Sequence, residues 1–358
     1  MRCMSRTRCS WLIVIIISSV ALSWLYLTHS KQDVFPEIHN SVSREKCPCA
    51  SGARMSTDDE PNLAYNKPNE SQTLTVVKQC GSRYGKAVLK DDITVVYNRV
   101  PKCGSRALLQ CVKSLVKKNQ IRGPIPMVPP TFKAELALLT RTVEGVRSQR
   151  RAFLEGHVRF NHFQDERVHY INMIRDPLNR LVSSFYFNRH GDGLLSPRQL
   201  ADVRNRTKPE VIDETFDECV SHERLSCTGP QVLSYVIGFF CGFHPRCRKA
   251  TQWTLDEAKR NLDYYTAVGI VEEYNSSMRV LEFLFPSMFT GLVKRYTRLS
   301  RDTDFQVKAH AHRYVPPSPK VKAYMTKKLK LEYEFYEYAK SRFDMLLDEL
   351  HLRDSDVR

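Results

Sequence analysis

Two short apolar runs, each followed by a polar turn and a helical pattern, stand out along the 358-residue chain. Residues 93–97 are all apolar or β-branched, and residues 168–174 form the second run. Runs of this length and composition predict buried strands. A helical pattern begins at residue 107 after the first run, and Pro177 suits the first helical turn after the second. The sequence therefore predicts two strand–loop–helix units.

Other segments extend this pattern, with less regular stretches between them. Residues 267–271 predict a further strand, and residues 319–350 predict a long helix whose aromatic stripe packs against the core. Residues 254–257 have the sequence of a capping box, which opens a helix. Residues 193–212 and 296–320 are polar or basic and lack a clear period, so we expect loops there.

The N-terminal quarter differs from the rest of the chain. Residues 11–27 are almost wholly apolar and follow three arginines, which predicts a transmembrane signal anchor with residues 1–10 in the cytosol. A cleaved signal peptide is the alternative. Residues 28–90 are rich in Ser, Asn, Pro and Lys and predict a lumenal stem. Residues 91–358 then form the globular domain, on the lumenal side of the membrane.

The loops after the two strands carry groups that bind phosphate. Lys102 and Ser105 lie between the first strand and its helix, and Arg175 directly follows the second strand. A loop of this kind aims backbone amides and a helix N-terminus at an anion. It is not the nucleoside-triphosphate loop, because the first glycine of that motif is missing. A plain turn with an exposed lysine is the alternative for the first loop alone, whereas two such loops together describe a nucleotide with two separate phosphate groups.

The two loops resemble those of a known family. Residues 100–106 read Val-Pro-Lys-Cys-Gly-Ser-Arg, and residues 174–183 read Ile-Arg-Asp-Pro-x-x-Arg-x-x-Ser. Both are similar to the 5′- and 3′-phosphosulfate-binding loops of Golgi carbohydrate sulfotransferases, and within these to the hexuronic acid 2-O-sulfotransferases. The resemblance runs from about residue 95 to about residue 347. Supporting stretches are residues 216–219, 239–247 and 332–339.

The resemblance implies an α/β sulfotransferase domain with a central, mostly parallel sheet flanked by helices. It implies 3′-phosphoadenosine-5′-phosphosulfate as the sulfate donor, and we find no coherent set of metal ligands in the sequence. By the family pattern, Lys102 acts at the bridging oxygen of the leaving 5′-phosphate, while Arg175 and Ser183 hold the 3′-phosphate. The residues expected to cradle the 5′-phosphate are Lys102, Cys103, Gly104, Ser105 and Arg106.

A histidine between the two loops is the candidate catalytic base. Residues 153–160 predict a strand or strand end that carries His157. A lone histidine is more often structural, and His162 and His169 are nearby alternatives. The place of His157 in the chain order matches the catalytic histidine of the family, and neutral imidazole is the natural base near neutral pH. The heparan-sulfate members resemble His-Gly-His here, whereas this chain has Glu155 first, which leaves the role of Glu155 open.

The chain has eleven cysteines, which suits an oxidising compartment. Cys219 and Cys227 bracket one polar loop, and Cys241 and Cys247 bracket another. Zinc would prefer closer Cys-x-x-Cys pairs, so we favour two local disulfides, which also match the family pattern. Acceptor sequences for N-glycosylation begin at Asn69, Asn205 and Asn275.

The formal net charge of +16 favours a polyanionic partner such as nucleic acid, an anionic membrane or an acidic polysaccharide. A basic surface that serves only solubility is the alternative. A lumenal domain argues against nucleic acid and leaves a glycosaminoglycan. Arg106, Arg159 and Arg189 are candidates to hold its carboxylates and sulfates. Family analogy further implies a homotrimer.

We therefore expect a single-pass type II enzyme of the Golgi membrane that transfers sulfate to the 2-hydroxyl of iduronic or glucuronic acid in a glycosaminoglycan. Residues 102–106 and 244–247 look closer to the dermatan and chondroitin sulfate branch than to the heparan sulfate branch. The enzyme alternatives are a heparan sulfate 2-O-sulfotransferase and a Pipe-like sulfotransferase acting on another glycan. The non-enzyme alternative is a lumenal glycosaminoglycan-binding protein.

Overall fold

A parallel sheet lies at the centre of the computed structural model, which describes residues 82–353. Its strands follow the order β2-β3-β1-β4-β5, and every pairing between neighbours is parallel. All carboxyl ends therefore lie along one edge. This sheet confirms the predicted α/β class. The strands are β1 Ile93–Tyr97, β2 Arg122–Met127, β3 Arg151–Gly156, β4 Val168–Ile174 and β5 Tyr265–Ile270.

Strand β1 occupies the middle of the sheet, and each of its five residues is buried. Tyr97 at its end pairs with Glu155 of β3 on one side and with Ile171 of β4 on the other. From β1 the chain runs outward to β2, returns through β3 and then crosses to β4. The loops after β1, β3 and β4 consequently meet where the strand order reverses, which is where open α/β sheets bind ligands.

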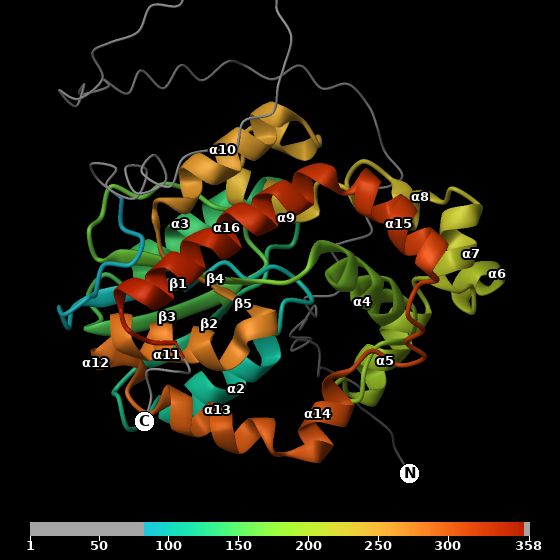
Figure 1. Cartoon of the computed structure of the whole chain (residues 1–358). Helices are drawn as coiled ribbons and strands as arrows, with labels where there is room; N and C mark the ends of the chain where they lie inside the picture. Colours follow the sequence, from blue (N-terminus) through green and yellow to red (C-terminus); the bar gives the residue numbers. More distant parts are fainter. Residues whose placement is uncertain (1–81, 354–358) are drawn as a thin grey trace, which may run out of the picture.

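Helices cover both faces of the sheet (Figure 1). One face is covered by α2 Ser105–Leu115, α11 Tyr274–Leu284, α12 Pro286–Phe289 and α13 Leu292–Ser300. The other is covered by α3 Phe132–Gly145, α9 Tyr235–Cys241, α10 Gln252–Leu262 and α16 Lys330–Glu349. Two short 3₁₀ turns, η3 Pro245–Arg248 and η4 Val271–Glu273, connect these elements. The aromatic stripe of α16 packs inward as predicted, since Phe335 and Tyr336 are buried.

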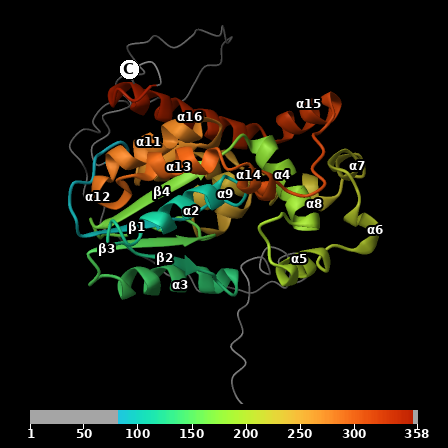
Figure 2. The same cartoon turned by 90° about the horizontal axis from the view of Figure 1, so that it is seen from below.

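A smaller helical unit lies beyond the α4 end of the sheet (Figures 1 and 2). Its own core includes Leu181 and Phe185 of α4, Phe216 of α7 and Met325 of α15. This unit forms the wall that faces the carboxyl edge of the sheet. Its helices are α4 Pro177–His190, α5 Pro197–Arg204, α6 Pro209–Ile212, α7 Phe216–Ser221, α8 Leu225–Thr228, α14 Thr303–Ala309 and α15 Pro319–Lys328.

Several sequence expectations need correction. The predicted start of a helix at residue 254 is wrong, because Thr251 caps α10 by accepting a hydrogen bond from the amide of Thr254. Helices α5, α6 and α14 and the second half of α13 lie within the segments expected to be loops, since helices this short show no clear period. The single long helix expected over residues 319–350 is two helices, because Leu329 leaves helical geometry with φ −89° and ψ 19° and packs into the smaller core.

The predicted cytosolic tail, the transmembrane anchor, most of the stem and Asn69 lie outside the described residues. Within residues 82–353, no helix combines the length and apolar character needed to cross a bilayer. The last residues assigned to the stem pack onto the domain. The amide of Arg83 donates to the carbonyl of Asp263, and Val88 is buried with its amide bonded to Leu284.

Candidate functional site

A cavity of about 1270 Å³ opens between the carboxyl edge of the sheet and the smaller helical unit. Its walls come from the loops after β1, β3 and β4 and from α4, α8 and α14. The cavity thus brings together residues that are far apart in the sequence. Those singled out by the sequence that line it are Lys102, Gly104, Ser105, Arg106, His157, Arg175, Ser183 and Arg189.

The loop between β1 and α2 turns sharply at two residues. Lys102 and Gly104 both have positive φ, +67° and +69°. A side chain at position 104 is excluded, because a Cβ there would lie 2.7 Å from the Tyr274 ring, whose hydroxyl donates to the Gly104 carbonyl. Gly104 has no side chain to cap α2, so the first amides of that helix face an anion site. Cys103 is fully buried, and burial raises the pKa of its thiol to about 12, so it is a packing group.

Positive charge dominates the floor of the cavity. Burial lowers the pKa of Lys102 to about 8; nearby Asp192 opposes this, and Arg106 and Arg175 add to it. The ammonium of Lys102 lies 4.1 Å from the centre of the Phe187 ring. Arg106 is already paired, with its Nη1 2.8 Å from Oδ1 of buried Asp192. Lys102, Arg106 and Arg175 carry three positive charges, and Asp192 offsets only one of them. An anion bound here would neutralise the remaining positive charge.

The loop between β4 and α4 supplies the opposite wall. Arg175 follows the last residue of β4 and is half-buried at the cavity surface. Asp176 caps α4 by accepting from the amide of Asn179 at 2.8 Å, and a proline occupies the first helical turn as expected. Ser183 and Arg180 are buried on α4 and line the cavity. The guanidinium of Arg180 stacks 4.7 Å from the centre of the Tyr235 ring, and its buried Nε has no hydrogen-bond partner among the described residues.

His157 directly follows β3 and is held by one residue at both ring nitrogens. Its Nδ1 lies 2.9 Å from the carbonyl oxygen of Arg99, and its Nε2 lies 2.9 Å from Nη1 of the same arginine. A carbonyl only accepts and a guanidinium only donates, so the proton of the neutral ring is on Nδ1 and the lone pair is on Nε2. Burial, together with the charge of Arg99, lowers the pKa of His157 to about 3.

The two alternative histidines lie elsewhere. His162 is exposed and contacts the ring of Tyr264. His169 is the second residue of β4, near the amino end of the sheet, and its Nδ1 lies 3.1 Å from the hydroxyl of Thr266. Neither residue lines the large cavity. Both histidines therefore lie apart from the loops that follow β1 and β4.

Besides Arg106, two other arginines were expected to bind substrate, and their surroundings differ. Arg159 does not line the cavity; its Nη1 lies 3.0 Å from Glu135 and its guanidinium packs on the Phe132 ring. Arg189 lies in the cavity wall but is 4% exposed. Its guanidinium donates to the carbonyl of Val211 and the hydroxyl of Ser226. Arg189 therefore also ties α4 to helices α6 and α8.

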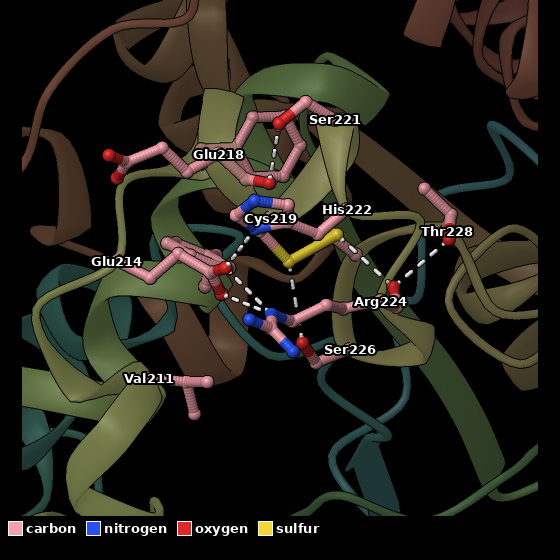
Figure 3. The surroundings of a disulfide bond; sticks show 12 residues. Val211, Glu214, Glu218, Cys219, Ser221, His222, Arg224, Ser226 and Thr228 are labelled. Carbon is pink, nitrogen blue, oxygen red and sulfur yellow. Dashed lines mark hydrogen bonds and ion pairs between the residues drawn. A yellow bond between two sulfur atoms is a disulfide. The ribbon is translucent and has the colours of Figure 1, made fainter.

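The disulfide Cys219–Cys227 joins α8 to α7, and Cys241 is bonded to Cys247 at the end of α9. Figure 3 shows Glu214 pointing toward His222 and Arg224 beside the Cys219 sulfur. The carboxylate of Glu214 is 2.8 Å from Nδ1 of the histidine and 2.6 Å from Nε of the arginine. The contacts of Glu214 with His222 and Arg224 thus lie next to α8, whose residues Leu225 and Ser226 line the cavity.

Non-reducing peptide mapping is expected to recover Cys219 joined to Cys227 and Cys241 joined to Cys247. The physical reason is that each pair closes a short loop, with sequence separations of 8 and 6, and so lies close together in the fold. Cys103 and Cys111 are buried and unpaired, so they should alkylate only after denaturation and serve as the control. Recovery of either pair as free thiols, or crossed, would contradict this framework.

Two predicted glycosylation sites fall on the described surface. Asn205 at the end of α5 and Asn275 at the start of α11 are both exposed. The hydroxyl residues of their acceptor sequences, Thr207 and Ser277, are buried. Within residues 82–353 no group of three or more His, Cys, Asp or Glu side chains is arranged to hold a metal ion.

Three residues of the site escaped the sequence analysis. Arg99 contacts His157, Tyr274 packs on Gly104, and Asp192 pairs with Arg106. Arg99 has a signal in hindsight, because it is a charged residue two positions beyond the end of a buried strand. Tyr274 and Asp192 have none, because no sequence period connects them with the residues that they contact.

A parallel sheet with a cationic cavity at its carboxyl edge, lined by the loops after two adjacent strands, defines an α/β protein with a site suited to an anionic ligand. The chain matches the sulfotransferase family over residues 86–339 and belongs to that family.

Known relatives cover most of the described region. The chain is 32% identical to "Uronyl 2-sulfotransferase" of Homo sapiens, over 70% of this chain and 63% of that protein. It is 32% identical to "Heparan sulfate 2-O-sulfotransferase 1" of Xenopus laevis, over 74% of this chain and 75% of that protein. The match thus spans less than two thirds of the human relative. A solved structure of retinol dehydratase with androsterone and the inactive cofactor PAP overlaps 76% of this chain and 83% of its own, at 11% identity and a TM-score of 0.26, too loose to support an inference.

Proposed function

We propose that the protein is a glycosaminoglycan 2-O-sulfotransferase that uses 3′-phosphoadenosine-5′-phosphosulfate and sulfates the 2-hydroxyl of a hexuronic acid. The observation that carries this proposal is the shared cavity, in which an unprotonated His157 faces the same space as Lys102 and Arg175. The family match and the printed names of both relatives support it. A protein that only binds glycans would not need an unprotonated histidine such as His157 facing this cavity.

The residues present fit such a donor. The open amides of α2 and the Ser105 hydroxyl suit the 5′-phosphate, because Gly104 leaves no side chain in the way. Lys102 adds a desolvated charge there. On the opposite wall, Arg175 and Ser183 suit the 3′-phosphate. The donor supplies the activated sulfuryl group, and these residues bind and orient it.

The chain's own groups account for the needs of the reaction. Sulfuryl transfer breaks the bond from sulfur to the 5′-phosphate oxygen and forms one from sulfur to the sugar oxygen, while the hydroxyl loses its proton. Nε2 of His157 is the accepting nitrogen, since Nδ1 donates to the Arg99 carbonyl. Lys102 offsets the charge that develops on the leaving phosphate, as fixed cations do in phosphoryl transfer.

Arg175→Ala is expected to weaken binding of 3′-phosphoadenosine-5′-phosphate by about 10- to 150-fold, because a charge-assisted contact contributes about 1.5–3 kcal/mol. Isothermal titration calorimetry on the purified protein measures this. Arg159→Ala is the matched control, because Arg159 pairs with Glu135 and does not line the cavity. Parent-like affinity in Arg175→Ala would mean that the second loop does not hold the nucleotide.

Within this function, we propose dermatan or chondroitin sulfate as the acceptor. Support comes from the sequence at residues 102–106 and 244–247 and from Glu155 in place of a histidine. Disaccharide analysis after incubation with the donor should find more 2-O-sulfate on these polymers than on N-sulfated heparosan. The reverse ranking would assign the chain to the heparan-sulfate branch, and no transfer to either polymer would refute the function itself.

We further propose that the domain works in the Golgi lumen, behind a single-pass anchor and a stem, and as a homotrimer. The apolar residues 11–27 with their arginine flank support the anchor, and the sulfate donor and glycan acceptor belong to that compartment. Protease protection of microsomes tests the topology, and light scattering of the purified protein tests the assembly.

A further inference from the structure

Arg99 lies at the centre of a small, partly buried network. Its Nε donates to Oε2 of Glu155 at 2.5 Å, and its Nη1 donates to Nε2 of His157 at 2.9 Å. The same Nη1 lies 3.5 Å from the hydroxyl of Ser105. The side chains of Arg99 and Glu155 are 16% and 12% exposed, so water screens their ion pair weakly.

This arrangement conflicts with the work assigned to His157. Its one lone pair is on Nε2, and that lone pair already accepts from Arg99. A sugar hydroxyl cannot transfer its proton to a nitrogen whose lone pair is occupied. Arg99 must therefore leave Nε2 before transfer, while the carbonyl of the same residue continues to orient the ring through Nδ1.

We propose that Arg99 is a positioning residue that covers the base in the empty site, and that an anionic group of the acceptor draws its guanidinium away and frees Nε2. The proposal rests on the function proposed above. Glu155 is the fixed partner, because its carboxylate accepts from Nε, and the planar guanidinium would pivot about this contact as a whole when Nη1 leaves His157. Glu155, whose role the sequence left open, thus keeps Arg99 within reach of both His157 and the acceptor.

The physical basis is a competition between two acceptors for one donor. A neutral imidazole accepts a weaker hydrogen bond from a guanidinium than a carboxylate or a sulfate does. Arg99 lines the cavity together with His157, so an anion on the acceptor can reach the same donors. Unmodified neutral sugars would leave the base covered. The acceptor offers two sources of this anion, the uronate carboxylate and a sulfate on the neighbouring sugar.

The first experiment needs no sulfate transfer. Diethyl pyrocarbonate acylates the free lone pair of a neutral imidazole, and mass spectrometry of the full-length protein gives the rate at each histidine. Because His157 is neutral in the folded protein, slow labelling reports the Arg99 contact rather than protonation. We expect His157 to react about 10- to 100-fold faster in Arg99→Gln, the range expected for losing a hydrogen bond to a charged donor.

Three further variants sharpen the result. Arg99→Lys keeps the charge but cannot bridge Glu155 and His157 together, so labelling should again rise, and Glu155→Gln should give a smaller increase. Asp263→Asn is the control, because it breaks the partly buried Asp263–Arg342 pair away from the cavity. Exposed His310 and His312 serve as internal references. Buried His190 reports unfolding, since its rate rises only if a variant loses structure. Unchanged labelling of His157 in Arg99→Gln and Arg99→Lys would overturn the proposal.

The second experiment tests release by the acceptor. In the parent, kcat should fall about 10-fold or more when the uronate of the acceptor is carboxyl-reduced, or when the neighbouring sulfate is removed, because Nε2 then stays covered. The arm that lowers kcat identifies the anion. In Arg99→Gln the kcat ratio between intact and altered acceptor should approach one. An equal ratio in parent and variant would overturn release by the acceptor. If neither the parent nor Arg99→Gln transfers sulfate, the proposed function fails. The labelling experiment still shows in that case whether Arg99 covers Nε2 of His157.

Discussion

His157→Ala is expected to lower kcat by about 10²–10⁴-fold, the usual contribution of a positioned general base. A sugar hydroxyl is a poor nucleophile until its proton is drawn away in the transition state. His157 is the histidine that follows β3 and lines the cavity beside both anion loops. Its loss should leave nucleotide affinity and the thermal unfolding temperature close to those of the parent, because no phosphate-binding residue is removed.

The comparison requires the other two histidines in parallel. His162→Ala and His169→Ala should retain most activity, because neither residue lines the cavity. Rate, nucleotide affinity and thermal unfolding should be measured for all three variants. If His157→Ala keeps most of its activity, or loses activity only together with its fold, the base is another group.

The pH dependence of the parent gives a second reading of the same residue. Burial and the Arg99 charge lower the pKa of His157 to about 3, so the imidazole is neutral throughout the mildly acidic range. The acid limb of kcat/KM that belongs to His157 should therefore lie below pH 5 and not near the ordinary histidine value of about 6.5. A limb near that value which disappears in His157→Ala would show that the imidazole is solvated in solution.

Lys102→Met is expected to lower kcat by about 10²–10³-fold, comparable to removing one preorganised donor from a developing oxyanion. Burial lowers the pKa of Lys102 to about 8 in the absence of an anion. The residue is thus charged below that pH and loses its charge as pH rises through it, so activity that depends on it should decline on the alkaline side. Lys102→Arg keeps a charge and should restore part of the loss.

Single-turnover rates at saturating donor isolate this step from binding. Lys117→Met is a matched control, because Lys117 is exposed and lies outside the cavity. Parent-like turnover in Lys102→Met at neutral pH would remove Lys102 from the transition state and leave the α2 amides and Arg175 as the source of charge stabilisation.

Buried parallel strands were the best-predicted part of the fold. The runs at residues 93–97 and 168–174 coincide with β1 and β4, because strands buried on both faces are mostly apolar, even though His169 and Asn172 interrupt the second run. The strand predicted at residues 267–271 is observed at Tyr265–Ile270. The prediction missed its first two residues because Tyr265 and Thr266 carry polar atoms, although both are buried. The loops proposed to bind phosphate were brought together in one cavity for a related reason, because polar residues directly after such runs lie at one edge of the sheet.

Contacts between distant segments could not be predicted in the same way. Glu155 lies on β3 and Arg99 lies two residues beyond the end of the neighbouring strand β1, so the two residues meet although they are 56 positions apart in the sequence. Arg159 and Arg189 look alike in the sequence, yet one pairs with Glu135 away from the cavity and the other lies in its wall. Only the packing of complete elements distinguishes them.

The strand order has a consequence for how the chain can vary in length. The loops after β1 and β4 are kept together by direct pairing of those strands, with Tyr97 opposite Ile171. Residues 128–150, which include α3, connect β2 to the amino end of β3. The length of this excursion therefore does not set the distance between the loops after β1 and β4. Insertions or deletions in that excursion can therefore accumulate between homologues without altering the distance between the two loops proposed to hold the donor's phosphates. Length changes in residues 98–104 or 175–176 would alter it directly.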